Sequence, residues 1–265
     1  MPRRARNLVF PLHANGAEPM NENARVEHMP DRIERGRNVR DGYQRGWGLQ
    51  FDKLADRIAK EPLFGRAYQL AQGRTAVAPY NLINLYLIIQ HFLGRLESQD
   101  IIEFGSYRGG SAVFMAWCQK KLYPGAKIYA LDTFEGMPET EDVDWHKPGD
   151  FGGPNIDEIC DFADQAGLDN LVFVKGRFQD TLPILLKSVR PFGLAHIDCD
   201  IYSAVKYCQD TMWNQMCNGG YLVYDDALVS SCMGATQAVE ELIMERRVHC
   251  EQIWPHAVFR AGLQS

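Results

Sequence analysis

The sequence has no CxxC spacing among its seven cysteines, and seven is an odd number. A disulfide framework and a zinc knuckle are therefore both unsupported, since each needs paired cysteines at regular spacing. Cys118, Cys208 and Cys217 lie inside apolar patterns, where a buried free thiol is the usual state. We expect a chain with reduced thiols in a cytoplasmic setting.

Long apolar runs and an excess of basic residues are also missing. The most apolar segment, 82–93, is interrupted by Asn84, Gln90 and His91, which argues against a membrane span. The apolar run near the N-terminus is too short for a signal peptide. A formal net charge of −6 argues against a nucleic-acid surface. The 265 residues, 46% of them hydrophobic, are enough for one large folded domain.

The N-terminal part differs in character from the rest. Residues 1–47 are rich in Arg, Asn, Gly and Pro without periodicity, which is typical of an exposed arm or a lid. Helical spacing follows at 51–60 and 63–72, and a strongly apolar helix is predicted over 80–97. We therefore expect an N-terminal arm with lid helices over 1–79 and a main domain over 80–265.

From residue 100 onward, short apolar runs alternate with helical patterns. Strands are predicted at 101–104, 127–131, 171–174, 194–197 and 221–224, and helices near 110–121, 157–166, 180–188, 203–215 and 234–247. This alternation predicts an α/β fold, a doubly wound and mostly parallel sheet with helices on both faces. Segments 250–254 and 257–260 could add a closing hairpin. Ligands of such sheets bind beyond the carboxyl ends of the strands.

A glycine-rich loop, EFGSYRGGS, follows the first predicted strand and opens a helix. Its glycines allow a sharp turn and close approach of a ligand, but the spacing is not the GxGxxG of dinucleotide sites. Glu103, just before Gly105, suits a ligand with a positive charge or an amine, and S-adenosylmethionine has both. The alternative is an ordinary strand–turn–helix corner.

Two further acids follow strands in the same half of the predicted sheet. Asp132 is placed to accept hydrogen bonds from ribose hydroxyls, although it could instead cap a helix. Asp180 could accept from an adenine amino group with Phe178 packing nearby, and a simple helix cap is an equal alternative. Together with the glycine loop, Asp132 favours a nucleoside site.

The sequences HIDCDIY and YDDAL follow the next two strands and carry four carboxylates. Asp198 and Asp200 share one face of an extended chain, and Asp225 and Asp226 should meet them at the same sheet edge. Like charges repel, and a divalent cation removes that cost. Carboxylate oxygens are ligands that Mg²⁺ prefers, so the pattern favours a metal site over two solvated turns.

The histidines are less informative. His196 is interpreted as a satisfied core residue rather than a ligand, and His249 and His256 as surface residues without a role. His146 lies in a long polar loop, 139–156, which is typical of a lid or binding loop. Together with Tyr202, beside the DxD motif, it is our prediction for the lining of an acceptor pocket.

These motifs together resemble the macrocin O-methyltransferase family, metal-dependent enzymes that methylate sugar hydroxyls of macrolide and aminocoumarin antibiotics. The resemblance covers roughly residues 80–260 and rests on EFGxYRGGSA, LDTFEGMP, GxFxDTLP, HIDxDxY and YDDA, in the family's order. It implies a class I, Rossmann-like methyltransferase fold that uses S-adenosylmethionine and Mg²⁺.

The resemblance also implies roles for single residues. The metal would be bound by Asp198, Asp225 and Asp226, and Asp200 would act as general base. For the cofactor, the glycine loop and the acids that follow the strands lead us to predict binding by Glu103, Gly105, Tyr107, Arg108, Ser111, Asp132 and Asp180. The family pattern most often has Gly between the two acids of the DxD motif, where this chain has Cys199.

The expected reaction is methylation of a hydroxyl of a glycosylated natural product, on a deoxysugar. A catechol-type O-methyltransferase is the main alternative, because vicinal hydroxyls of an aromatic ring could also chelate a metal. A nicotinamide oxidoreductase is disfavoured by the absent GxGxxG, and a non-catalytic nucleoside-binding protein would not explain four converging acids. The apolar helix at 80–93 suggests a subunit contact, so we expect a homo-oligomer.

Overall fold

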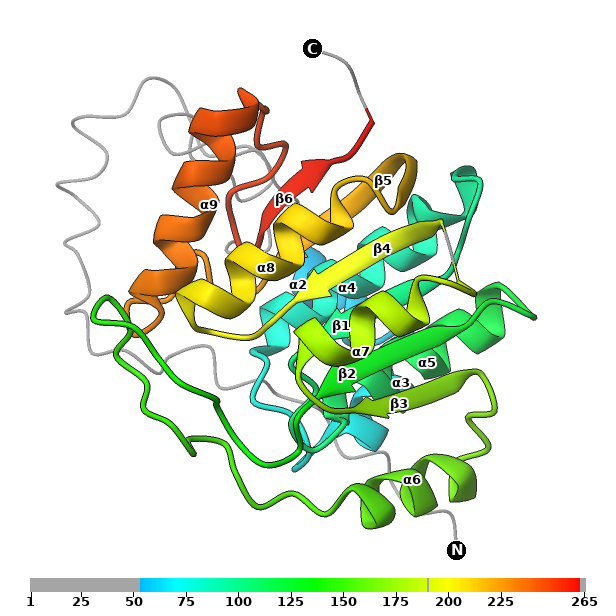
Figure 1. Cartoon of the computed structure of the whole chain (residues 1–265). Helices are drawn as coiled ribbons and strands as arrows, with labels where there is room; N and C mark the ends of the chain where they lie inside the picture. Colours follow the sequence, from blue (N-terminus) through cyan, green and yellow to red (C-terminus); the bar gives the residue numbers. More distant parts are fainter. Residues whose placement is uncertain (1–52, 190, 263–265) are drawn as a thin grey trace, which may run out of the picture.

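The computed structural model describes residues 53–189 and 191–262 (Figure 1). The predicted arm, 1–47, lies outside the described residues. The strands are β1 (Ile101–Phe104), β2 (Ile128–Asp132), β3 (Leu171–Lys175), β4 (Phe192–Ile197), β5 (Met216–Tyr224) and β6 (Ala257–Arg260). These positions confirm the five strands expected from the alternating pattern, with β4 and β5 starting earlier than predicted.

The six strands form one sheet in the order β3-β2-β1-β4-β5-β6. All neighbours are parallel except β5 and β6, which pair antiparallel from Tyr221↔Arg260 to Tyr224↔Ala257. The chain runs outward from β1 to β3 and then returns to β4 on the other side of β1. A ligand crevice is expected at this reversal, beyond the carboxyl ends of β1 and β4.

The C-terminal hairpin forms only in part. β6 pairs along its length with β5, whereas residues 250–254 contribute a single isolated bridge, Gln252↔Val258. The segment before β6 is therefore not a strand, and β6 closes the sheet as its edge. This pairing brings the start of β6 next to the carboxyl end of β5.

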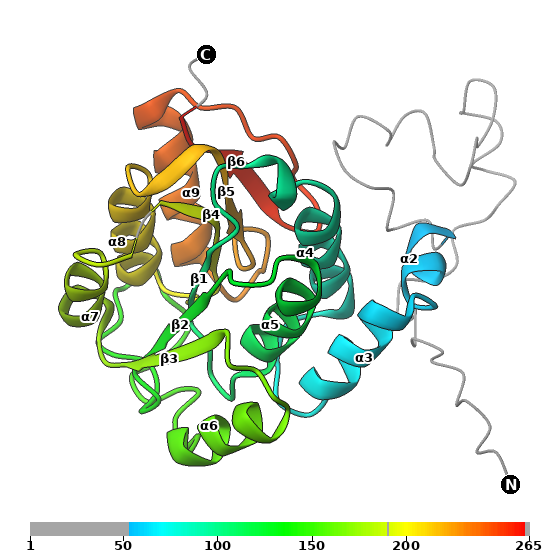
Figure 2. The same ribbon diagram turned by 90° about the vertical axis from the view of Figure 1, so that its right-hand side faces the viewer.

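Helices cover both faces of the sheet, as Figure 2 shows. One layer contains α3 (Pro62–Ala71), α4 (Pro79–His91) and α5 (Gly110–Leu122), with α2 (Lys53–Ile58) beyond them. The other contains α7 (Phe178–Leu185), α8 (Tyr202–Met212) and α9 (Met233–Arg246), and α6 (Ile156–Gln165) lies beside β3. The doubly wound α/β architecture is confirmed.

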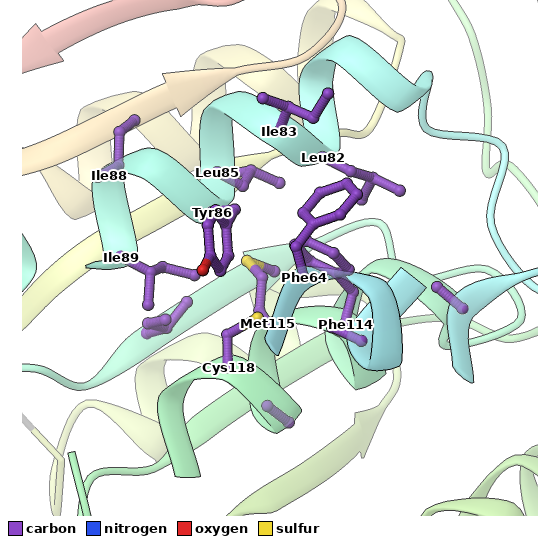
Figure 3. Packing of buried hydrophobic residues seen from close by; sticks show 14 of the residues in the cluster. Phe64, Leu82, Ile83, Leu85, Tyr86, Ile88, Ile89, Phe114, Met115 and Cys118 are labelled. Carbon is purple, nitrogen blue, oxygen red and sulfur yellow. The ribbon is translucent and has the colours of Figure 1, made fainter. Parts of the chain in front are cut away.

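The helix predicted over 80–97 ends earlier, at His91, and a short 3₁₀ turn, η2 (Leu93–Arg95), follows. Its residues 81–89 are all buried, and Figure 3 shows Leu82 and Tyr86 on the side that packs against α3 and α5. Phe64 lies edge-on to both Tyr86 and Phe114, with ring centroids 5.5 Å apart in each pair. Within the described residues α4 therefore offers no exposed apolar face. The observation that suggested a subunit contact at this helix, a free apolar surface, does not hold.

Across residues 53–189 and 191–262, no helix combines the length and apolarity that a bilayer crossing requires.

Candidate active site

A cavity of about 500 Å³ opens at the carboxyl ends of β1, β2, β4 and β5. Its walls come from the glycine loop after β1, the acidic turns after β2, β4 and β5, and the loop that carries His146. The segment 75–78, between α3 and α4, completes the wall. This position agrees with the crevice expected where the strand order reverses.

The glycine loop packs directly on the DxD segment. Gly105 has φ +90°, and a Cβ atom there would lie 1.7 Å from the carbonyl oxygen of Asp198, so only glycine fits. The backbone N–H of Asp198 in turn donates to the carbonyl of Phe104 at 2.9 Å. Tyr107 and Ser111 also line the cavity. The two motifs read from the sequence are thus two sides of one site.

Asp132 holds the glycine loop in place through its carboxylate. Its Oδ2 accepts the backbone N–H groups of Ser106 at 2.8 Å and Tyr107 at 2.7 Å, and its Oδ1 accepts that of Phe134 at 2.8 Å. Burial raises the pKa of Asp132, although these three hydrogen bonds oppose the shift. Oδ1 also lies 3.4 Å from Thr133 Oγ1, but that hydroxyl makes its shorter hydrogen bond, 2.7 Å, to the carbonyl of Gly136. Oδ1 can therefore accept a further hydrogen bond, because each carboxylate oxygen can accept two.

Three carboxylates converge beyond β4 and β5. Asp198, Asp225 and Asp226 each offer an oxygen, and these oxygens lie within 4.8 Å of one another. Burial raises the pKa of Asp198 and of Asp226 well above the usual range, and the neighbouring carboxylates raise both further. An all-oxygen donor set with uncompensated negative charge fits a hard divalent cation.

Asp225 differs from the other two because the chain itself supplies its donors. Its Oδ1 accepts from Asn81 Nδ2 at 2.8 Å and lies 2.8 Å from His256 Nε2 and 3.6 Å from His196 Nε2. Burial alone would raise the pKa of Asp225, but the two histidines outweigh burial and hold it well below the usual range. All three groups contact Oδ1. Among the described residues, none donates a hydrogen bond to Oδ2.

His256 was expected at the surface, and that expectation is wrong. Its side chain is fully buried, with Nε2 toward Asp225 and Nδ1 2.9 Å from Asn84 Nδ2. The antiparallel pairing of β6 with β5 carries it there, since Ala257 pairs with Tyr224, the residue before Asp225. A surface position would leave Asp225 without its shortest histidine contact.

His196 is a buried core residue, as expected, and it lies between two carboxylates. Its Nδ1 lies 3.1 Å from Glu103 Oε1, and both side chains are fully buried. Burial alone lowers the pKa of His196, but the carboxylates of Asp225 and Glu103 outweigh it and raise the pKa to about 9. Asn81, Glu103, His196 and His256 therefore form a polar layer beneath the three aspartates.

Asp200 sits apart from these three, in a left-handed conformation with φ 59°. A non-glycine residue held there costs of order 1–3 kcal/mol, and such residues cluster at functional sites. Its backbone N–H donates to Asp226 Oδ2 at 2.8 Å, and its side chain accepts from the Cys232 thiol at 3.3 Å. Burial raises the pKa of Asp200, which makes its carboxylate a better proton acceptor.

The loop 139–156 docks onto the helices that follow β4 and β5. Asp144 accepts the backbone N–H of Tyr202, at the start of α8, at 2.9 Å. A Cβ atom on Gly234 would lie 1.9 Å from Asp144 Oδ1, so this docking requires glycine at the start of α9. The docked loop places His146 on the cavity wall, with Nε2 3.7 Å from Asp200 Oδ1.

Four residues assigned from the sequence do not line this cavity. Glu103 is buried behind the wall against His196, and Tyr202 donates its hydroxyl to Glu241 at 2.9 Å. Arg108 is exposed and lines a neighbouring polar pocket. Asp180 is exposed in the first turn of α7 but is not its cap, since the N-cap is Arg177 and no side chain makes a cap hydrogen bond there; Gln179 lines the cavity instead.

Sequence reasoning missed Asn81, Cys232 and the segment 75–78, all of which line the cavity. A signal for Asn81 was present, since an amide inside a strongly apolar helix must find a buried partner. Cys232 carries no such signal, because cysteine is common in apolar surroundings.

Comparisons with known proteins place the chain in a family. Among solved structures, calicheamicin methyltransferase CalS11 has a similar fold and superimposes with a TM-score of 0.63 at 18% identity, covering 88% of this chain and 100% of that one. At that identity the likeness shows the fold alone.

The family model of macrocin-O-methyltransferase (TylF) matches residues 72–252. The chain therefore belongs to this family of S-adenosylmethionine-dependent O-methyltransferases. The 8-demethyl-8-(2,3-dimethoxy-alpha-L-rhamnosyl)-tetracenomycin-C 4'-O-methyltransferase of Streptomyces olivaceus is 26% identical, over 65% of this chain and 69% of its own length. The mycinamicin III 3''-O-methyltransferase of Micromonospora griseorubida is 24% identical, over 62% and 68%.

Proposed function

We propose that the protein transfers the methyl group of S-adenosylmethionine to a deoxysugar hydroxyl of a glycosylated natural product in a Mg²⁺-dependent reaction. One observation carries the proposal: the glycine loop and the three converging aspartates face the same cavity. A methyl donor on one side and a metal-held acceptor on the other would then meet with little motion, and such positioning can supply much of a rate enhancement.

The cofactor half would be formed by Gly105, Tyr107, Ser111 and Asp132, all of which line the cavity. Gly105 leaves room at the closest point between the loop and Asp198. Asp132, whose Oδ1 retains acceptor capacity, suits a ribose hydroxyl. Gln179 and Phe178 line the same cavity and offer a polar edge and an aromatic face for an adenine ring.

The metal half would be formed by Asp198, Asp225 and Asp226. When bound, Mg²⁺ would lower the pKa of the acceptor hydroxyl and S-adenosylmethionine would supply an activated methyl group. Asp200 would take the hydroxyl proton, since its pKa is raised and it lies next to Asp226. His146, 3.7 Å from the Asp200 carboxylate, would line the acceptor side.

Four exposed apolar side chains belong to the cavity wall or are next to wall residues in the chain. Trp145 and Met233 are 74% and 60% exposed, next to His146 and Cys232 in the chain. Leu228 and Val229 line the cavity and remain 50% and 39% exposed. Exposed apolar groups gathered beside a cavity mark a binding surface. An acceptor with a polar sugar and an apolar aglycone would match this arrangement, as the names of the two relatives suggest.

Methyl transfer from labelled S-adenosylmethionine, measured with EDTA and after addition of excess Mg²⁺, tests the proposal. We expect no turnover in chelator, recovery with Mg²⁺, and activity on glycosylated acceptors rather than on simple catechols. Full turnover in chelator would remove the metal from the mechanism. Efficient turnover of catechols with none of glycosides would establish the catechol-type alternative.

A further inference from the structure

A second group of potential metal ligands lies on the cavity wall. His146 Nε2 lies 3.7 Å from Cys232 Sγ and 3.7 Å from Asp200 Oδ1, and Cys232 Sγ lies 3.3 Å from Asp200 Oδ1. All three residues line the cavity. They come from the loop 139–156, the residue before α9 and the turn after β4. The group combines a nitrogen, a sulfur and an oxygen, unlike the three aspartates.

The spacing of these atoms matches that of ligands around one zinc ion. Zn²⁺ binds sulfur at about 2.3 Å and nitrogen or oxygen at about 2.0–2.2 Å, so tetrahedral ligands lie roughly 3.4–3.6 Å apart. The three observed separations, 3.3, 3.7 and 3.7 Å, are therefore close to those of an occupied site. Three protein ligands leave a fourth position open toward the cavity.

The other ring nitrogen of His146 also has a suitable partner. Nδ1 lies 3.5 Å from Asp150 Oδ2, and that oxygen accepts the backbone N–H of Lys147 at 2.9 Å. A histidine that binds a metal almost always turns its second nitrogen to a carboxylate or carbonyl, which fixes the ring and its tautomer. With its proton on Nδ1, His146 would present the Nε2 lone pair to Cys232 and Asp200.

We propose that His146, Asp200 and Cys232 form a second cation site, which binds a soft divalent ion such as Zn²⁺ and inhibits methyl transfer. The donor set decides the ion, because thiolate and imidazole suit Zn²⁺ whereas Mg²⁺ requires oxygens. Inhibition follows from the position of Asp200, which would bind the ion instead of the acceptor proton. This consequence rests on the function proposed above, but binding itself does not.

The thiol must lose its proton for the site to fill. Burial and the carboxylates of Asp226 and Asp200 raise the pKa of Cys232, so the free cluster holds a neutral thiol that donates to Asp200. A bound dication would reverse this preference, because a coordinating thiol is deprotonated outright. The side chains of His146 and Asp200 are 15% and 19% exposed, which gives an ion access from the cavity.

Titration with Co²⁺ in saturating Mg²⁺ tests the site directly, because Co²⁺ replaces Zn²⁺ and thiolate ligation produces a near-ultraviolet charge-transfer band. The matched variants are Cys232→Ser, which keeps a donor to Asp200, and Cys160→Ser, which alters a thiol on α6 that does not line the cavity. We expect the band in the wild type and in Cys160→Ser, and its loss in Cys232→Ser. A third variant, Asp150→Asn, should keep the band but bind Co²⁺ about 10–100-fold more weakly.

Zn²⁺ inhibition, expressed against the uninhibited rate of each variant, gives the functional readout. The Zn²⁺ concentration for half inhibition should rise by about tenfold or more in Cys232→Ser and stay constant in Cys160→Ser, since loss of a ligand costs at least as much as loss of its outer partner. An unchanged band in Cys232→Ser would overturn the site, and inhibition relieved by excess Mg²⁺ would place Zn²⁺ at the three aspartates. An inactive enzyme that still shows the thiolate band would contradict the proposed function and leave the cation site intact.

Discussion

At the β1–β2 end of the cavity, the carboxylate of Asp132 accepts backbone N–H groups from Ser106, Tyr107 and Phe134. At the β4–β5 end, Asp198 and Asp226 face other carboxylates, and their pKa values rise well above the usual range. The same residue type thus serves two purposes at one sheet edge. At the first end, backbone N–H groups surround the carboxylate and it holds the glycine loop in place; at the second end, carboxylates lie close to one another, and we propose that a cation binds them.

Asp225 stands between these two cases. Asn81 and His256 supply donors to one of its oxygens, and the pKa is held low. It would therefore remain ionised and fixed in direction before any metal arrives. The contrast between the two ends of the cavity, and the intermediate position of Asp225, can be tested residue by residue.

The largest effect is expected from removing one of the three carboxylates that would bind the metal. Asp226→Ala should reduce methyl transfer to background, because the metal loses a ligand and Asp200 loses the acceptor of its backbone N–H. Circular dichroism should show an intact fold, since relief of repulsion among the acids offsets the lost contact. Activity near that of the wild type would contradict the cation requirement at this end.

The next effect separates the two acids of the DxD motif. Asp200→Asn should lower kcat by about 10²–10⁴, the range for loss of a general base. Its affinities for Mn²⁺ and S-adenosylmethionine should change little. Asp198→Asn should instead lose Mn²⁺ binding. The roles are exchanged if Asp198→Asn keeps the metal and Asp200→Asn loses it.

A smaller effect is expected from the donors of Asp225. His256→Gln removes the imidazole 2.8 Å from Asp225 Oδ1, and loss of such an outer partner typically costs about 10–100-fold in metal affinity. Manganese binding measured by electron paramagnetic resonance would report it without an activity assay. His249→Gln, which alters a histidine outside this network, is the matched control. Equal Mn²⁺ affinities in both variants would show that the chain does not hold Asp225 for the metal.

The smallest effect belongs to the β1–β2 end. Asp132→Asn should weaken S-adenosylmethionine binding by ~1–2 kcal/mol, because a hydrogen bond to a charged group is worth about 1.5–3 kcal/mol and asparagine keeps one acceptor oxygen, with Mn²⁺ affinity unchanged. Glu103→Gln is the informative companion, because Glu103 lies behind the cavity wall against His196. Calorimetry should show cofactor affinity reduced in Asp132→Asn and retained in Glu103→Gln. Reduced cofactor affinity in Glu103→Gln would support the prediction, made from the sequence, that Glu103 binds the cofactor.

Much of this site could be predicted because parallel strands bring their carboxyl ends to one edge. Asp132 ends a strand, and Asp198, Asp225 and Asp226 follow strands, so the strand order alone predicted their positions at the cavity. His256 could not be placed in this way, because its burial depends on β6 pairing antiparallel with β5. Glu103 shows the other limit, since strand position does not say whether a side chain faces the ligand or the core.

Cys232 marks a third limit. Its contacts with His146 and Asp200 join a loop, a turn and the start of a helix, and no spacing in the sequence relates the three. The division at residue 80 and the homo-oligomer remain predictions, as does the role of the arm over residues 1–47 in closing the acceptor side. The family model begins at residue 72, before that boundary.

Equilibrium binding of Mn²⁺ to the wild type and to Asp198→Asn, without cofactor or acceptor, tests the central claim most directly. We expect one ion bound to the wild type, displaced by Mg²⁺, and none bound to the variant at the same concentrations. Equal Mn²⁺ binding by the two proteins, or none by the wild type, would contradict the claim that the carboxylates beyond β4 and β5 hold a divalent cation.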